Sequence, residues 1–426
     1  MSEHFDVIVV GAGPGGMAAA AIAAEAGRKV CLIDENPAPG GQIWRGYERE
    51  SETLSPHRME FLRWRRRLAA SGCATWNEAC VLAAPQRNTL RIEQGAQCVD
   101  LSYGKLILAT GARERFLPFP GWTLPGVLGV GGLQAFMKAG LDVRGQRIVL
   151  AGSGPLLLAV AASLTRAGAR VLMMAEQASR QTLLNLSFHL ALLHPAKMME
   201  GVTCRWQTRR VPYKQQAWVA RAEGRDRLER AILRVNGSDE TIECDLLACA
   251  YHLVPNLELP LLLGCAVENG VVRVDEQQRS SVEDVLCIGE LTGVGGLDKA
   301  IVEGQIAGNH AAGRTTQAYE LVPELKKHRQ FVQWLDEAFA LRPELRALAE
   351  ADTIVCRCED VVRERLEACN SWREAKLHTR CGMGPCQGRI CGPATEFLFG
   401  WDTRSARPPA MPGRVGSLAG EDVHES

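Results

Sequence analysis

The chain has 426 residues, of which 46% are apolar, and its 49 basic residues equal its 49 acidic residues in number. A chain of this length can form two or three packed domains, whereas its balanced charge argues against nucleic acid or another polyanion as a partner. The first apolar run, at residues 5–10, is too short to cross a bilayer and follows no basic leader. We therefore expect a cytoplasmic protein.

The first predicted elements are a strand at residues 6–10, an alanine-rich helix up to residue 27 and a second strand at residues 29–33. Between the first strand and the helix stands the glycine-rich sequence Gly11-Ala12-Gly13-Pro14-Gly15-Gly16. This order of strand, glycine-rich turn, helix and strand is typical of a dinucleotide-binding domain.

Each glycine of the fingerprint has a separate task. Gly11 permits the tight turn, Gly13 lets backbone N–H groups approach a pyrophosphate at the helix N-terminus, and Gly16 lets helix and strand pack closely. The second strand ends at Asp34, with Glu35 next to it, where an acid would bind a ribose hydroxyl. The pattern therefore predicts a complete nucleotide site.

Later segments indicate which dinucleotide is bound: Pro39-Gly40-Gly41-Gln42, Ala109-Thr110-Gly111, Ile288-Gly289-Glu290 and Gly295-Gly296-Leu297. With the first fingerprint, they resemble flavoproteins of the glutathione reductase type across residues 1–312. The resemblance implies FAD, with Glu290 in place of the more usual Asp at the ribityl chain and a following helix end that favours negative charge on the reduced flavin. The implied cofactor-binding residues are Gly11, Gly13, Pro14, Gly16, Asp34, Glu35, Gly41, Gln42, Ala109, Thr110, Gly111, Gly289, Glu290, Gly296 and Leu297.

A second fingerprint spans residues 148–176 and contains Gly152-Ser153-Gly154-Pro155-Leu156-Leu157. Leu157 stands where the first fingerprint has its third glycine. In the first fingerprint, the count from the first glycine to the acid ends at Asp34. The same count from Gly152 ends at Ala175, and Glu176 comes one residue later. A leucine at this position would push helix from strand and narrow the approach of a pyrophosphate. We expect a domain that keeps the fold and binds NAD(H) weakly or not at all.

The sequence lacks the features of thiol–disulfide exchange and of acid–base catalysis on a substrate. Disulfide reductases of this superfamily carry a redox cysteine pair near the flavin, whereas residues 40–46 contain no cysteine. The 9 histidines are dispersed and form no evident acid–base pair. We therefore predict neither thiol–disulfide exchange nor a catalytic residue for substrate oxidation on this chain.

Residues 313–350 are rich in charged, helix-favouring side chains and are predicted to form a helical connector. Residues 401–426 are rich in Pro, Gly, Ser and charge, which predicts a flexible tail or a segment that lies on a partner.

Cysteines gather between these two segments, as Cys356-x-Cys358 and then Cys381-x4-Cys386-x4-Cys391. In an extended segment, side chains two apart point the same way, so Cys356 and Cys358 can hold one ion or cluster. Iron–sulfur, zinc and unmetallated thiols are the alternatives, and the flavin-type fold favours 2Fe-2S because a flavin can pass single electrons to iron but not to zinc. Cys381 and Cys391 are equally distant in sequence from Cys386, so the spacing leaves the fourth ligand open.

The cysteine module resembles a bacterioferritin-associated-ferredoxin-like 2Fe-2S domain, through Cys356-Arg357-Cys358-Glu359 and the run from Thr379 to Cys391. With the flavin-type segments and residues 109–122, the chain up to about residue 400 is similar to the alpha subunit of heteromeric opine oxidases, D-hydroxyproline and proline dehydrogenases, and hydrogen cyanide synthase. Related modules often carry another residue at the position of Cys381. The resemblance therefore implies the ligands Cys356, Cys358, Cys386 and Cys391.

The same resemblance implies partners. A flavoprotein beta subunit of the glycine oxidase type would oxidise the amine on a separate chain, and a small gamma subunit can complete such a complex. A respiratory acceptor would link the complex peripherally to the inner face of the cytoplasmic membrane. The present chain would then transfer the electrons.

We therefore expect an α/β chain with two dinucleotide-binding (Rossmann-like) domains of the glutathione reductase type and a small C-terminal helical 2Fe-2S domain. The expected division is an FAD-binding domain at 1–145 and 255–312, an NAD-binding-like domain at 146–254, the connector at 313–350, the 2Fe-2S domain at 351–400 and the tail at 401–426.

Two functions follow from these expectations. The first is an electron-transfer subunit of an amine or amino-acid dehydrogenase of the D-hydroxyproline, proline or opine class. The alternative is a stand-alone NADH-dependent reductase that delivers electrons to a protein acceptor, and Leu157 favours the first. A third, non-redox hypothesis is a flavin-type scaffold that carries a structural zinc site.

Overall fold

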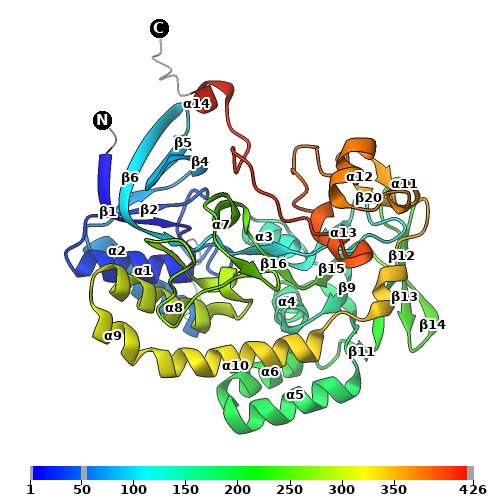
Figure 1. The fold of residues 1–426 in the computed structure, drawn as a ribbon. Coiled ribbons are helices and arrows are strands. Elements are labelled where there is room, and N and C mark those ends of the chain that lie inside the picture. Colours follow the sequence, from blue (N-terminus) through cyan, green and yellow to red (C-terminus); the bar gives the residue numbers. More distant parts are fainter. Residues whose placement is uncertain (1–2, 49–54, 420–426) are drawn as a thin grey trace. The chain divides into compact units, whose positions relative to one another are not determined.

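The computed structural model describes residues 3–48 and 55–419, which divide into two compact units (Figure 1). The first unit is drawn from Met1–Arg113, Val254–Val332 and Arg404–Ser426, and the second from Glu114–Leu253 and Gln333–Thr403. Within the described ranges, no helix has the length and apolar character needed to cross a membrane.

The first unit is built on a sheet with the strand order β3-β2-β1-β6-β5-β4, in which β19 also pairs with β6. Strands β3, β2, β1, β6 and β19 run parallel, whereas β5 and β4 pair antiparallel. β2, β19 and the second half of β1 are buried apolar runs, as expected for parallel strands covered on both faces. The bounds are β1 Glu3–Val10, β2 Val30–Ile33, β3 Ala74–Trp76, β4 Ala79–Gln86, β5 Thr89–Gln94, β6 Gln97–Leu108 and β19 Val285–Cys287.

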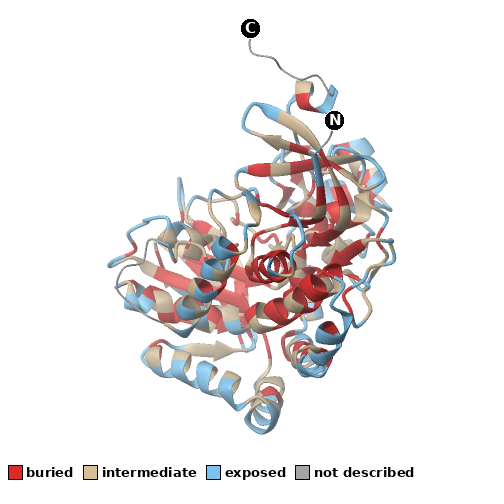
Figure 2. Cartoon of the chain, turned by 90° about the vertical axis from the view of Figure 1, so that its left-hand side faces the viewer, coloured by how far each residue is buried: buried red, intermediate tan, exposed pale blue. Residues whose placement is uncertain are grey.

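Helices α1 (Pro14–Glu25) and α8 (Gly296–Ala311) pack together in the first unit, and most of their residues are buried (Figure 2). Small residues let the two backbones approach closely. A Cβ atom on Gly304 would lie 2.2 Å from the carbonyl oxygen of Gly15, and one on Gly308 would lie 2.7 Å from that of Ala19. The helix that follows the first glycine-rich turn is therefore held by direct backbone contact with α8.

The second unit repeats the design with a parallel sheet of order β11-β10-β9-β15-β8. An antiparallel sheet of order β12-β13-β14 lies in the same unit. The strands are β8 Val127–Gly129, β9 Arg147–Ser153, β10 Arg170–Glu176, β11 Tyr213–Gln215, β12 Ala217–Glu223, β13 Arg230–Val235, β14 Ser238–Glu243 and β15 Leu246–Tyr251. The helices between them are α3 Val130–Lys138, α4 Pro155–Arg166, α5 Arg180–Leu193 and α6 Pro195–Gln207.

The region predicted as a connector contains α9 (Thr315–Glu320), α10 (Val322–Phe339) and a 3-10 helix at Pro343–Ala347. The cysteine-rich module follows in the second unit with β20 Ile354–Cys356, β21 Val361–Val362, α11 Arg363–Glu367, α12 Trp372–Thr379 and α13 Cys391–Phe399.

The described end of the chain lies on the first unit. The backbone N–H of Ala410 donates to the carbonyl oxygen of Leu82 at 2.6 Å, and that of Arg414 donates to the Glu93 carboxylate at 3.0 Å. A short helix, α14 (Val415–Ala419), follows these contacts.

Because α1 and α8 cross so closely, adding a single methyl group at the crossing should destabilise the fold. Gly304→Ala should lower the free energy of unfolding by about 1–3 kcal/mol, because the new Cβ meets backbone rather than a mobile side chain. The matched control is Gly201→Ala in α6, where nothing lies within 4 Å of the added Cβ and the better helix propensity should stabilise by up to about 1 kcal/mol. Denaturant titration measures both, and equal stabilities for the two variants would contradict the packing argument.

Candidate functional site

The first glycine-rich loop joins β1 to α1 in the way that the fingerprint predicts. Gly11 has φ +104°, and a Cβ there would lie 2.3 Å from the carbonyl oxygen of Ala109; a Cβ on Gly16 would lie 1.8 Å from that of Gly11. Gly13 differs, because nothing lies within 4 Å of its added Cβ. Two of these glycines are therefore required by the fold, while Gly13 borders open space at the N-terminus of α1.

Asp34 ties the end of β2 to this loop. Its carboxylate accepts a hydrogen bond from the backbone N–H of Ala12 and two more from Asn36, through the backbone N–H and the side-chain amide, both at 2.7 Å. Asp34 is buried, whereas Glu35 is exposed. Asp34 is thus fixed beside the loop, and Glu35 points to solvent.

The segment around Gly41 lies directly on the loop. Gly41 has φ +58°, and a Cβ there would lie 2.9 Å from the Cα of Gly13. Gln42 is exposed, while Trp44 is only 1% exposed. The indole N–H of Trp44 has no hydrogen-bond partner in the part of the chain that the structure describes. A buried donor of this kind is satisfied when a ligand supplies an acceptor.

The other predicted flavin residues lie at the ends of β6 and β19. The Thr110 hydroxyl donates to the carbonyl oxygen of Asn256 at 3.0 Å, and the Asn256 amide donates back to the Thr110 carbonyl at 2.7 Å. Ala109 precedes this pair and Gly111 follows it with φ +69°. Since β1, β2, β6 and β19 are parallel, their following residues gather at one edge of the sheet.

Glu290 stands in the turn between β19 and α8. One carboxylate oxygen accepts a hydrogen bond from the backbone N–H of Gly296 at 3.0 Å, while Oε2 has no partner among the described residues. Burial raises the pKa of Glu290 above its ordinary value. Leu297 is buried in the next turn, in α8, and Gly289 begins the same turn as Glu290.

A buried ion pair holds this turn. The Lys299 ammonium donates to the Glu303 carboxylate at 3.1 Å and to the carbonyl oxygens of Gly289 and Gly293 at 2.9 and 3.0 Å. Glu303 in turn accepts from the backbone N–H of Gly289 at 2.7 Å. These bonds fix the Glu290 turn from beneath.

The residues at this edge fit a flavin dinucleotide. The open side of Gly13 suits a pyrophosphate, and the buried Trp44 N–H and Glu290 Oε2 are one donor and one acceptor without partners in the described ranges. The structure brings the first loop, Asp34 and the residues that follow β6 and β19 together at one sheet edge, whereas Glu35 is exposed.

The second glycine-rich loop, between β9 and α4, has a different environment. Leu157 is fully buried in the core beneath α4, together with Val160 and Leu164. Its side chain therefore does not narrow the outer side of the loop, contrary to the expectation from sequence.

Glu176, the last residue of β10, has the role in the second unit that Asp34, just after β2, has in the first. Its carboxylate accepts from the Ser153 hydroxyl at 3.0 Å and from the backbone N–H groups of Gly154 and Ala178, both at 2.9 Å. Burial raises the pKa of Glu176 to about 7. The spacing in the sequence predicts Ala175 for this role, which is wrong by one residue. The pairing of β10 with β9 shifts register after Val171, and this irregularity adds one residue to the strand.

The cysteines form a buried group in the C-terminal module. The sulfur atoms of Cys356, Cys381 and Cys391 lie within 4.8 Å of one another, an arrangement that could hold a metal ion. Thiols of Cys381 and Cys391 donate to the Cys356 sulfur and lower its pKa to about 2, and the Cys391 thiol lowers the pKa of Cys386 to about 5. Cys358 is exposed and contacts Cys386. Cys381, which the family resemblance leaves out, thus lies inside the group.

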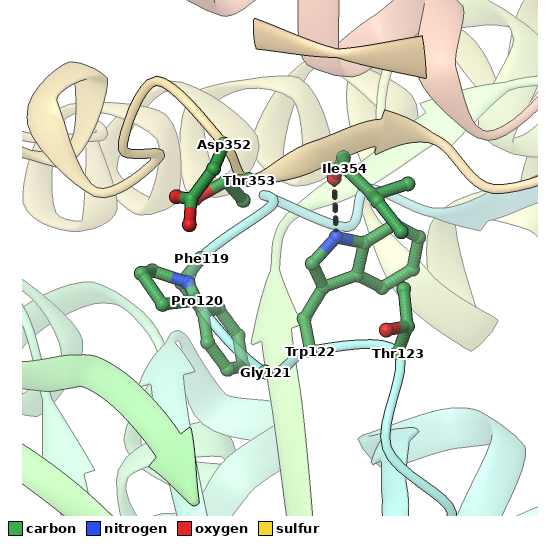
Figure 3. Close-up of a pocket in the computed structure, with 8 residues that line it drawn as sticks. All are labelled: Phe119, Pro120, Gly121, Trp122, Thr123, Asp352, Thr353 and Ile354. Carbon is green, nitrogen blue, oxygen red and sulfur yellow. Dashed lines mark hydrogen bonds between the residues drawn. The ribbon is translucent and has the colours of Figure 1, made fainter. Parts of the chain in front are cut away.

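A tryptophan anchors this module within the second unit (Figure 3). The Trp122 indole N–H donates to the carbonyl oxygen of Ile354 at 2.5 Å, two positions before Cys356. Phe116 packs against Trp122 with ring centroids 5.0 Å apart. A small cavity of about 160 Å³ lies between the Trp122 loop and the segment before Cys356, lined by Phe119, Pro120, Gly121, Trp122, Thr123, Asp352, Thr353 and Ile354.

The two parallel sheets with their glycine-rich loops define an oxidoreductase with paired FAD- and NAD-binding domains, and a cysteine cluster lies in its C-terminal region. Residues 5–316 match the family described as pyridine nucleotide-disulphide oxidoreductase, and the chain belongs to that family. The predicted α/β class is confirmed.

Curated relatives extend over nearly the whole chain. An opine oxidase subunit of Rhizobium meliloti (strain 1021) is 31% identical, with 97% of this chain and 98% of the relative covered. The hydrogen cyanide synthase subunit HcnB of Pseudomonas protegens is 31% identical, with 90% and 89% covered. The predicted resemblance to these subunits is confirmed.

Solved structures share the fold. L-proline dehydrogenase from P. horikoshii aligns with a TM-score of 0.72 at 18% identity and covers 98% of this chain and 80% of its own. Thioredoxin reductase from T. acidophilum aligns with a TM-score of 0.58 at 18% identity over 74% of this chain and all of its own. At these identities the likeness concerns the fold alone.

The open side of Gly13 makes a test of flavin binding possible. Gly13 has φ −69° and free space around its Cβ position, so Gly13→Val should fold, while its side chain blocks a pyrophosphate. We expect at least about a tenfold loss of bound flavin, measured by absorbance after denaturation, with an unchanged circular dichroism spectrum. Gly201→Val is the control at a helix position with equally free space, and full flavin content in folded Gly13→Val would refute the assignment.

The cysteine group allows a ligand to be separated from a packing residue. If Cys386 is a ligand and Cys381 is not, Cys386→Ser should lose iron and labile sulfide, whereas Cys381→Ser should keep both. Metal analysis and visible absorbance measure the outcome, and Cys369→Ser is the control outside the group. Loss of iron in Cys381→Ser together with retention of iron in Cys391→Ser would show that Cys381, and not Cys391, is the fourth ligand. Zinc without iron in the parent protein would favour a structural zinc site.

Proposed function

We propose that the chain is the FAD- and 2Fe-2S-containing electron-transfer subunit of a heteromeric amine or amino-acid dehydrogenase of the D-hydroxyproline, proline or opine class. The observation that carries the proposal is the buried cysteine group in a chain whose first glycine-rich loop belongs to a flavoprotein fold. The relatives named as subunits of opine oxidase and of hydrogen cyanide synthase support a role inside a larger enzyme.

The residues of the first unit would hold FAD. Gly13 would admit its pyrophosphate, while Gly11 and Gly16 shape the loop around it. Asp34 would bind its ribose, and the free oxygen of Glu290 a hydroxyl of its ribityl chain. FAD can accept two electrons and release them one at a time, which a 2Fe-2S cluster requires. Lys299 and Glu303 would keep the Glu290 turn in place while the charge of the cofactor changes.

The cysteine thiols of the second unit would hold the cluster. Cys356, Cys358, Cys386 and Cys391 are the proposed ligands, and the protons that the thiols now share would leave when metal binds. Cys381 would then be a buried neighbour of the cluster, close enough to affect its potential.

A partner would supply the substrate chemistry. Oxidation of a CH–NH group to an imine releases two electrons and two protons, and we assign this step to a flavoprotein beta subunit of the glycine oxidase type. An exposed apolar stripe on α5 and α6 supports the presence of a protein partner, since large apolar side chains on a surface mark interaction sites. Its residues, between 45% and 65% exposed, are Leu184, Phe188, Leu192, Met199, Val202 and Trp206.

The test compares the purified chain with the complex assembled with its partner. We expect the chain alone to reduce no dye with proline, D-hydroxyproline or opines, and the complex to do so with one of them. In the complex, Cys386→Ser should abolish dye reduction and leave the flavin content intact, because only the cluster is lost. Amine oxidation by the isolated chain would overturn the proposed division of work between two chains.

A further inference from the structure

The second glycine-rich loop lies at the edge where a nucleotide binds in folds of this kind. Strand β9 ends at Ser153, β10 is followed by Gln177, and β15 is followed by His252. These strands are neighbours in one parallel sheet. Ligands of such sheets bind outside the carboxyl ends of the strands, so these three side chains mark the expected position of a dinucleotide.

A segment of the chain itself occupies this position. The carbonyl oxygen of Phe339, the last residue of α10, accepts hydrogen bonds from the Ser153 hydroxyl at 3.3 Å and from the Gln177 amide at 3.2 Å, and the His252 ring nitrogen also contacts it. Residues 339–342, called the strap below, therefore bridge the ends of all three strands.

Gln177 binds the strap at both ends of its amide. Its Nε2 also donates to the carbonyl oxygen of Ala340 at 3.1 Å, and its Oε1 accepts from the backbone N–H of Arg342 at 3.1 Å. Gln177 is fully buried and Ser153 is 5% exposed. The polar groups that would recognise a ribose or a phosphate are thus already satisfied by backbone.

Packing reinforces these hydrogen bonds. Phe339 is buried beside Leu186 of α5, Leu341 packs against the core formed with the β12-β13-β14 sheet, and the Arg342 guanidinium lies 5.4 Å from the ring of Trp218. The strap is consequently part of the second unit's core rather than a loop on its surface.

We propose that the strap excludes NAD(H) from the second nucleotide site, so that this chain cannot take electrons from a free pyridine nucleotide. The hydrogen bonds between the strap and the strand ends carry the proposal. Gly154, like Gly13, has nothing within 4 Å of an added Cβ, but the Ser153 hydroxyl and the Gln177 amide at the neighbouring strand ends already bind the backbone of the strap. The fold keeps the pyridine-nucleotide domain as a scaffold, and the chain's own backbone takes the place of the ligand.

The experiment measures binding directly, with NAD⁺ as the probe. Isothermal titration of the full chain should detect no binding at millimolar NAD⁺. The double variant Leu341→Gly/Arg342→Gly removes the strap's packing but leaves Ser153, Glu176 and Gln177 intact. The apparent affinity for NAD⁺ is proportional to the fraction of molecules whose site is open. Because the double variant raises that fraction, it should bind NAD⁺ at least about tenfold more tightly than the wild type.

Two control variants test whether the gain in binding belongs to the strap. Ala347→Gly, at an exposed position of the following helix, and Leu157→Gly, within the α4 core, should both leave binding undetectable. Hydrogen exchange of the backbone amides around Arg342 measures opening of the strap independently of binding. These amides should be protected in the wild type. They should exchange faster in the double variant and in Gln177→Ala.

Three outcomes would overturn the proposal. Micromolar NAD⁺ binding by the wild type would show that the strap does not cover the site. Faster exchange without any gain in binding would show that something other than the strap excludes the nucleotide. Unchanged exchange in both variants would show that the assigned contacts do not hold the strap.

Discussion

In the first unit, three segments that are distant in sequence meet backbone to backbone. The turn at Gly11 touches the carbonyl of Ala109, and α1 crosses α8 where Gly15 meets Gly304. No side chain could fit between these surfaces, so the loop has one position relative to the ends of β6 and β19. The predicted flavin-binding residues depend on that constraint, because they come from all three segments and converge at a single sheet edge.

The two glycine-rich loops of this chain share a plan and differ in what covers them. Each has a buried acid at the end of its second strand, Asp34 in one unit and Glu176 in the other. The carboxylate of each accepts hydrogen bonds from backbone N–H groups of the loop or its flank. Such a carboxylate is therefore a structural element of the loop as well as a contact for a ribose. The difference in function comes from what lies above the loop, which in the second unit is residues 339–342. If the chain receives electrons from a partner, as proposed, such closure would keep NADH from competing as an electron donor.

Sequence reasoning succeeded where the constraint is local. The tight turn at Gly11 and the helix–strand contact at Gly16 follow from which backbone conformations and distances only glycine allows, and these can be read from a few residues. The predicted position of the second acid is one residue early, because an irregularity in the β10–β9 pairing cannot be recognised from residue spacing. The sequence also suggested that Leu157 narrows the second nucleotide site, whereas its side chain lies in the core. The strap was not predictable, because Gln177 and Ala340 are far apart in sequence and no motif connects them.

In the cysteine module, two of the proposed metal ligands, Cys356 and Cys391, also belong to the small core of the domain. Its core consists of few side chains, and three of them are cysteines: the set is Val355, Cys356, Val361, Leu366, Trp372, Ala375, Cys381, Cys391 and Trp401. A core of this size rarely supplies more than about 3–5 kcal/mol, and small domains usually add a metal or another cross-link. Bound metal would therefore stabilise the fold of the module itself. The Trp122 bond to Ile354 ties the strand that carries Cys356 to the larger core of the same unit, so this proposed ligand would be held in position even without a metal.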